Sequence, residues 1–172
     1  MMSGDGHRRN RNRGFFQLIV WQDATKLYRL TWEAFRGWPF ERRKVASQQI
    51  ASVDSIHRNI AEGDCRRSLK EYLNFLNIAR GSLGEGVSGF LNYHQADRLN
   101  AEQFDALDSL AYKLENGLIK LIGALEGKRD SGDWKENLSV REKSTVSYLA
   151  KTKEADWLRE WLDESFFSET GS

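Results

Sequence analysis

Few side chains of this 172-residue chain have the chemistry of a catalytic or metal site. His7, His57 and His94 lie far apart, and the Glu-x-x-His pairs that bind di-iron centres in helical bundles do not occur. His57 borders a predicted apolar helix face, which favours a packed or interfacial histidine over a metal ligand. The sequence therefore predicts no metal site.

Cys65 is the single cysteine, and it stands beside Arg66 and Arg67, a setting that activates thiols. No candidate base or second cysteine accompanies it. The stretch G-S-L-G-E-G at 81–86 has the spacing of a phosphate loop but no preceding strand. These residues predict neither a cofactor nor an enzyme, and the lone cysteine favours the cytoplasm.

Basic residues give the strongest chemical signal. Residues 1–99 hold 16 basic and 10 acidic side chains and residues 130–172 hold six and ten, although the whole chain has a net charge of +1. Arginine binds phosphate in bidentate fashion, so this asymmetry favours a nucleic-acid partner, or an acidic tail that competes with one. The candidate nucleic-acid-binding residues are Arg8, Arg9, Arg11, Arg13, Arg42, Arg43, Lys44, Arg58, Arg66 and Arg67.

Apolar residues recur every three or four positions, as on the buried face of an α-helix. This spacing predicts helices at about 16–36, 39–62, 68–98 and 101–126, and a fifth, amphipathic one at about 139–165. The expected organisation is a disordered basic arm (1–14), a bundle (15–126), a linker (127–137) and an amphipathic helix with a tail (138–172). Four long helices with short connections predict an all-α, antiparallel up-down four-helix bundle. No apolar run is long enough to cross a membrane, and we expect no membrane partner.

Capping patterns mark the ends of these helices. Gly63 occupies the position of a C-terminal cap glycine, and Ser68 with Glu71 makes an S-x-x-E capping box. Asn100 with Gln103 repeats the capping pattern. Gly63 predicts where the second helix ends, and the two capping boxes predict where the third and fourth helices begin.

Asn59 and Glu62 lie in the last turn of the second predicted helix. We expect them to satisfy backbone N–H groups at the junction with the third helix. The alternative is that a carboxylate here orients Arg66 and Arg67 toward phosphate.

Four glycines fall inside the third predicted helix, where each costs roughly 1 kcal/mol against alanine. They indicate a close approach of a neighbouring backbone, a bend, or a locally weak helix held by packing, and the last of these is favoured. The four are Gly81, Gly84, Gly86 and Gly89.

Several short motifs occur in a fixed order: L-I-V-W-Q-D-A at 18–24, W-P-F-E at 38–41, N-I-A-E-G at 59–63, R-R-S at 66–68 and F-L-N-I-A-R-G-S-L at 75–83. Over about residues 15–126 the chain resembles the bacterial four-helix-bundle family of 23S rRNA intervening-sequence proteins. That family is similar in fold to the accessory variability determinants of diversity-generating retroelements.

The resemblance implies a ring-shaped homopentamer without catalytic activity that binds structured RNA or an RNA–DNA hybrid, as the partner of a reverse transcriptase or of ribosomal RNA. The family pattern has an arginine pair where this chain has Ile50 and Ala51. Either the arginines named above replace that pair, or binding is altered. The alternative function is an oligomeric scaffold whose tail docks another protein and which binds no nucleic acid.

Overall fold

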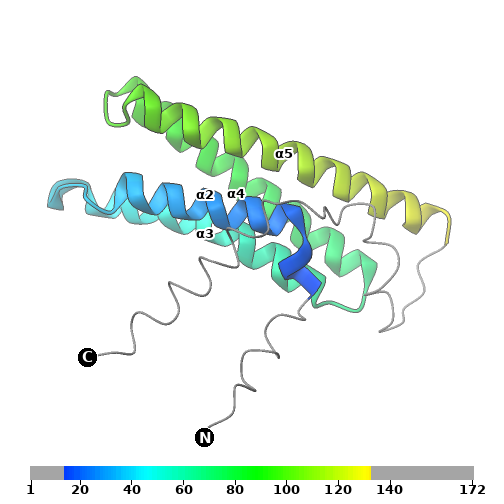
Figure 1. Cartoon of the computed structure of the whole chain (residues 1–172). Helices are drawn as coiled ribbons and strands as arrows, with labels where there is room; N and C mark the ends of the chain where they lie inside the picture. The colour runs from blue at the N-terminus through cyan, green and yellow to red at the C-terminus, as the bar shows by residue number, and fades with distance from the viewer. Residues whose placement is uncertain (1–13, 133–172) are drawn as a thin grey trace, which may run out of the picture.

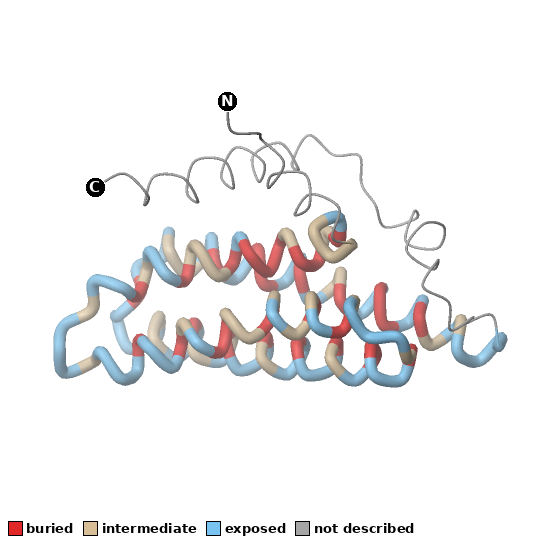
Figure 2. The backbone as a smooth tube through the Cα atoms, turned by 90° about the horizontal axis from the view of Figure 1, so that it is seen from below, coloured by how far each residue is buried: buried red, intermediate tan, exposed pale blue. Residues whose placement is uncertain are grey.

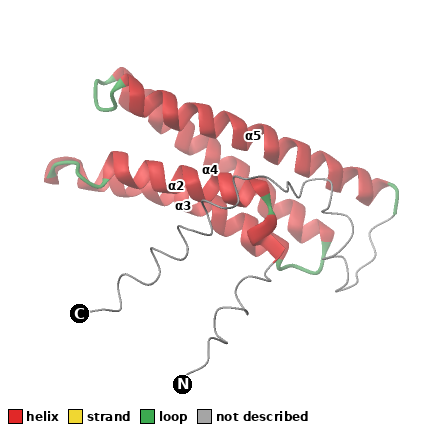
Figure 3. Ribbon diagram, viewed as in Figure 1, coloured by secondary structure: helices red, strands yellow, loops and turns green. Residues whose placement is uncertain are grey.

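Four long α-helices lie side by side in the computed structural model, which describes residues 14–132 (Figure 1). Two short 3-10 turns precede the first two of them. In chain order the elements are η1 (Gly14–Gln17), α2 (Ile19–Phe35), η2 (Phe40–Arg42), α3 (Arg43–Asp64), α4 (Leu69–Gln95) and α5 (Ala101–Asp130). Over the described residues there is helix and loop but no strand, as the sequence predicted (Figure 3).

The bundle closes because each helix packs against two others. Contacts join α2 to α3, α3 to α4, α4 to α5 and α5 back to α2, so α3 and α5 are diagonal to each other. Short turns connect consecutive helices, which therefore run antiparallel. The buried positions of every helix face the interior, and the outer positions are exposed (Figure 2).

The core consists of the aliphatic residues whose spacing predicted the helices. Leu27, Ile56, Leu76 and Leu114 each have no exposed surface. Burying a side chain of this size contributes about 1.5–3 kcal/mol, so these faces determine how the helices pack.

Helix boundaries differ from the prediction at four places, one of which is the end of α4 at Gln95 instead of about residue 98. Leu18 is extended, so the first predicted helix divides into η1 and α2. Pro39 precedes the turn η2, and α3 begins only at Arg43. The fourth helix was predicted to end at about residue 126, which is wrong, because α5 continues to Asp130. Gly132, with a φ of 71°, follows the end of α5.

The two predicted capping boxes have different outcomes. Asn100 accepts a hydrogen bond from the Gln103 backbone N–H at 2.8 Å, and the Gln103 side chain accepts one from Asn100 N–H at 3.2 Å, which confirms the second box. Ser68 does occupy the N-cap of α4, but its hydroxyl makes no capping hydrogen bond, so the first box is wrong. The Glu71 carboxylate lies instead 3.9 Å from the guanidinium of Arg66.

The glycines of α4 fall into two pairs. A Cβ on Gly86 would lie 3.1 Å from Val53, and one on Gly89 would lie 1.9 Å from Gln49 Oε1, so this pair permits close approach of α3. A Cβ on Gly81 or Gly84 would meet nothing within 4 Å. The close-approach interpretation therefore holds for one pair only.

Several expectations lie outside the described residues. These are the basic arm up to residue 13, residues 133–137 of the predicted linker, and the predicted amphipathic helix at about 139–165 with its tail. The linker prediction is wrong for residues 127–130, which belong to α5. Among the described helices, none is both long and apolar enough to cross a membrane.

Candidate nucleic-acid interface

The turn between α3 and α4 carries Arg66 and Arg67. The Arg66 guanidinium forms an ion pair with Glu62 one turn earlier in α3, and its Cζ lies 4.9 Å from the centre of the Phe75 ring on α4. Glu71 approaches it at 3.9 Å. Arg66 is therefore held in place, and its ion pair with Glu62 is the carboxylate contact on which one of the two sequence alternatives depends. Arg67 is exposed, and no ion pair within residues 14–132 involves it.

Gly63 has a different role from the one predicted. It lies inside α3, which ends at Asp64 with Cys65 as its right-handed C-cap, so the cap-glycine assignment is wrong. A Cβ at Gly63 would lie 2.8 Å from Tyr72 Cδ2 and 3.0 Å from Phe75 Cβ. The glycine therefore lets the start of α4 pack closely against the end of α3, which positions the arginine-bearing turn.

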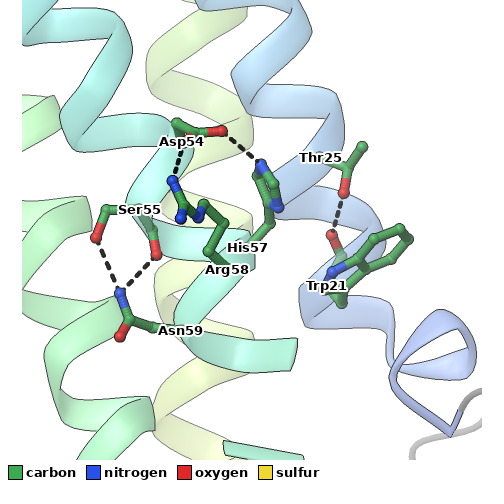
Figure 4. Close-up of polar contacts among 7 residues, drawn as sticks. All are labelled: Trp21, Thr25, Asp54, Ser55, His57, Arg58 and Asn59. Carbon is green, nitrogen blue, oxygen red and sulfur yellow. Dashed lines mark hydrogen bonds and ion pairs between the residues drawn. The ribbon is translucent and has the colours of Figure 1, made fainter. Parts of the chain in front are cut away.

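Asn59 does not satisfy backbone N–H groups at the junction. Its Nδ2 donates to the Ser55 carbonyl at 2.7 Å and to Ser55 Oγ at 2.9 Å (Figure 4). Ser55 Oγ lies 3.0 Å from Ser82 Oγ on α4. This expectation is wrong because the Asn59 amide lies one turn beyond Ser55 and hydrogen-bonds to it within α3. Ser55 in turn contacts Ser82 on α4.

Arg58 and His57 share one carboxylate. Asp54 Oδ2 accepts from Arg58 Nη1 at 3.3 Å, and Asp54 Oδ1 lies 3.0 Å from His57 Nε2 (Figure 4). The Arg58 side chain remains 74% exposed, so its charge faces solvent. The three-residue spacing of Asp54 and His57 in the sequence is the signal from which this contact could have been predicted.

His57 is a packed histidine, as predicted. Its ring lies edge-on to Tyr28, with ring centres 5.5 Å apart, and is 6.4 Å from the ring of Trp21. Burial lowers the pKa of His57 below its usual value, and the neighbouring Asp54 carboxylate opposes part of that shift. The imidazole therefore favours its neutral form. Within residues 14–132, no group of three or more His, Cys, Asp or Glu side chains is placed to hold a metal ion.

A second group of basic residues lies at the opposite end of α3. Arg42, Arg43 and Lys44 stand at its start, and Arg43 Cζ lies 5.1 Å from the ring centre of Phe40, which is 76% exposed. The 22 residues of α3 extend over about 33 Å. The structure therefore does not bring this group together with Arg66 and Arg67.

The outer face of α3 connects the two groups. Lys44, Ala51 and Arg58 are exposed and seven residues apart, so they share one side of the helix. Ile50 is half-buried and packs against the core. Of the two positions where the family pattern has arginine, only Ala51 thus lies on the exposed face.

The basic arm is attached near Arg66 and Arg67. Gly14 begins η1, which packs against α2 and α3 at the end of the bundle where α2 starts and α3 finishes (Figure 1). Phe15 and Phe16 fix this turn, because the centres of their rings lie 5.3 and 4.9 Å from the centre of the Trp21 ring. Arg8, Arg9, Arg11 and Arg13 lie outside the described residues, but Arg13 is bonded to Gly14.

A comparison with known protein families identifies a match over most of the bundle. The sequence model described as 23S rRNA-intervening sequence protein matches residues 16–120, which include α2, α3, α4 and most of α5. No curated protein matches the chain.

Proposed function

From the premise that this chain belongs to the 23S rRNA-intervening sequence protein family, we propose that it is a non-enzymatic, cytoplasmic, homo-oligomeric protein that binds structured RNA or an RNA–DNA hybrid. Its partner in the cell is ribosomal RNA or a reverse transcriptase. The pentameric ring implied by the resemblance is the assembly we favour.

The observation that carries this proposal is that Arg66, Arg67 and the attachment point of the arginine-rich arm lie at the same end of the bundle (Figure 1). Phosphate contacts from arginine supply affinity without reading sequence, and the arginines of the basic arm add to them. Arg66 is fixed by two carboxylates and a ring, whereas Arg67 is exposed and adjacent to it. We therefore assign the main phosphate contact of the turn to Arg67.

Exposed apolar side chains support assembly into an oligomer. Trp32 on α2, Ile78 and Leu91 on α4 and Phe40 before α3 are 43–76% exposed. Large apolar side chains that are exposed on one subunit can be buried between the subunits of an oligomer. In a ring, the arginine-bearing ends of the subunits would repeat around one axis and strengthen a modest charge per chain.

Filter binding of a structured 23S rRNA fragment, measured over a range of salt concentrations, tests this proposal. Arg67→Ala should weaken binding and reduce the salt slope by about 0.7–0.9, the loss of one phosphate contact. Arg98→Ala is the matched control, because Arg98 is exposed in the turn between α4 and α5. If the full-length protein binds no RNA or hybrid at low salt, the scaffold function replaces nucleic-acid binding.

A further inference from the structure

An open groove of about 460 Å³ lies between α2 and α5. Ile19 and Val20 line its α2 side, and Tyr112 and Gly117 line its α5 side. A Cβ on Gly117 would lie only 2.9 Å from Val20 Cγ1, so the missing side chain lets the two helices meet at the groove floor. The Tyr112 side chain is 68% exposed at the edge. The groove therefore offers an apolar floor and an exposed aromatic ring.

The α5 edge of the groove is basic. Lys113 and Lys120 line it, and Lys113 Nζ donates to the largely buried Asp23 carboxylate at 3.1 Å. Asp23 thereby fixes the α5 lysine nearest to α2. A helix that carries apolar residues on one face and carboxylates beside them complements this surface.

Such a segment exists in the same chain, in the part that lies outside the described residues. Residues 154–164 read E-A-D-W-L-R-E-W-L-D-E, with five acidic residues and one basic residue. In a helix, Trp157, Leu158, Trp161 and Leu162 form one apolar stripe, because positions three and four apart lie on the same side. The charge of the segment is opposite to that of the α5 edge.

The chain is long enough to deliver this segment. The described chain ends at Gly132, beyond α5, and Gly117 lies about 22 Å back along the helix axis. About 24 residues join Gly132 to Trp157, and a chain of that length reaches about 36 Å even when fully helical and further when extended. A tether matched to the distance gives an effective concentration in the millimolar range, which favours docking within the chain over capture of a second copy.

We propose that residues 154–164 dock as an amphipathic helix in the α2–α5 groove of their own chain. The two tryptophans pack against Ile19, Val20 and Tyr112, and the carboxylates face Lys113 and Lys120. The docked segment covers the α2–α5 seam as a fifth helix. This inference does not depend on nucleic-acid binding.

Photo-cross-linking of the full-length protein tests the proposal. The photoreactive amino acid p-benzoylphenylalanine replaces Tyr112, and mass spectrometry identifies the peptide it captures. We expect cross-links to residues 154–164. The same amino acid in place of Phe40 is the matched control, because Phe40 is also an exposed aromatic residue but lies at the other end of α2 and should not capture this peptide.

Two further measurements identify the occupant. An equal mixture of nitrogen-15-labelled and unlabelled chains should give cross-links of single isotopic composition, and mixed ones would overturn docking within the chain. The double variant Trp157→Ser/Trp161→Ser should lower the cross-link yield at least tenfold while the four-helix bundle stays folded, whereas Trp134→Ser should not lower it. Capture of α2 or α5 from a second copy, or no capture of 154–164, would overturn the proposal.

Discussion

Gln49 of α3 lies directly against Gly89 of α4, where a β-carbon would come within 1.9 Å of the amide oxygen. The glutamine side chain is buried, and its Nε2 donates to the Gly86 carbonyl at 2.9 Å. If residues 86 and 89 carried side chains, the Gln49 amide could not lie between α3 and α4. Two glycines and one buried glutamine therefore make a specific polar contact between α3 and α4.

Gly89→Ala should destabilise the protein. The added methyl group displaces the Gln49 amide, and a buried amide without its partner costs about 1–3 kcal/mol. Chemical denaturation followed by circular dichroism measures the change in the free energy of unfolding. Gly84→Ala is the matched control in the same helix, because a Cβ there meets nothing within 4 Å. That control should stabilise the protein by up to about 1 kcal/mol. Equal stability of the two variants would contradict a requirement for space at Gly89.

Sequence periodicity was sufficient for the helices but not for all of their ends. The apolar residues from Leu107 to Leu125 recur every three or four positions, which predicts a helix, and α5 contains all of them. The break at Leu18 carries no glycine or proline signal, and it arises because η1 turns to pack on α2 and α3. Gly127 resembles a cap in sequence, yet an exposed glycine within a helix is tolerated when the helix continues to a later end.

The candidate site could be predicted as a set of residues but not as an arrangement. Arg66 was assigned from charge and motif, but its contacts with Glu71 and Phe75 depend on how α4 turns back against α3. Gly63 was predicted as a cap because, in the sequence, it follows Ile60, the last residue of the apolar pattern of α3. Its true neighbour, Tyr72, comes from the next helix, and contacts of that kind are set by tertiary packing.

Acidification should destabilise the protein through His57. Burial lowers the pKa of His57 in the folded state, so the unfolded chain binds more protons below its ordinary value of 6.5. Stability therefore rises with pH through this window and falls as the pH drops below about 6.5. Urea denaturation at pH 7.5 and pH 5.0 measures the difference, and His57→Gln should reduce it.

Asp54→Asn provides the complementary test of the same pair. The Asp54 carboxylate raises the pKa of His57 through its charge and hydrogen bond, and Arg58 lowers it slightly. Without that carboxylate, protonation of the buried imidazole becomes less favourable, so the loss of stability between pH 7.5 and 5.0 should increase. A loss identical to that of the unmodified protein would mean that Asp54 does not act on His57.

The ion pair between Lys113 and Asp23 should stabilise the contact between α5 and α2. The Asp23 side chain is only 12% exposed, and Lys113 Nζ donates to it at 3.1 Å. Lys113→Met keeps the aliphatic stem but leaves a largely buried carboxylate without this charge, so we expect a loss of about 1–2 kcal/mol. The double variant Asp23→Asn/Lys113→Met should be less destabilised than the sum of the single variants. Simple additivity would show that the pair is not coupled.

Ala51→Arg should strengthen nucleic-acid binding. Position 51 lies on the exposed face of α3 between Lys44 and Arg58, where the added guanidinium completes a basic row along the helix. One additional phosphate contact should increase the salt slope by about 0.7–0.9 and raise the affinity several-fold at low salt. Ala106→Arg is the matched control, because Ala106 is exposed on α5, diagonally across the bundle from α3. If both variants raise RNA affinity equally, the outer face of α3 is not the binding surface and the gain reflects net charge alone.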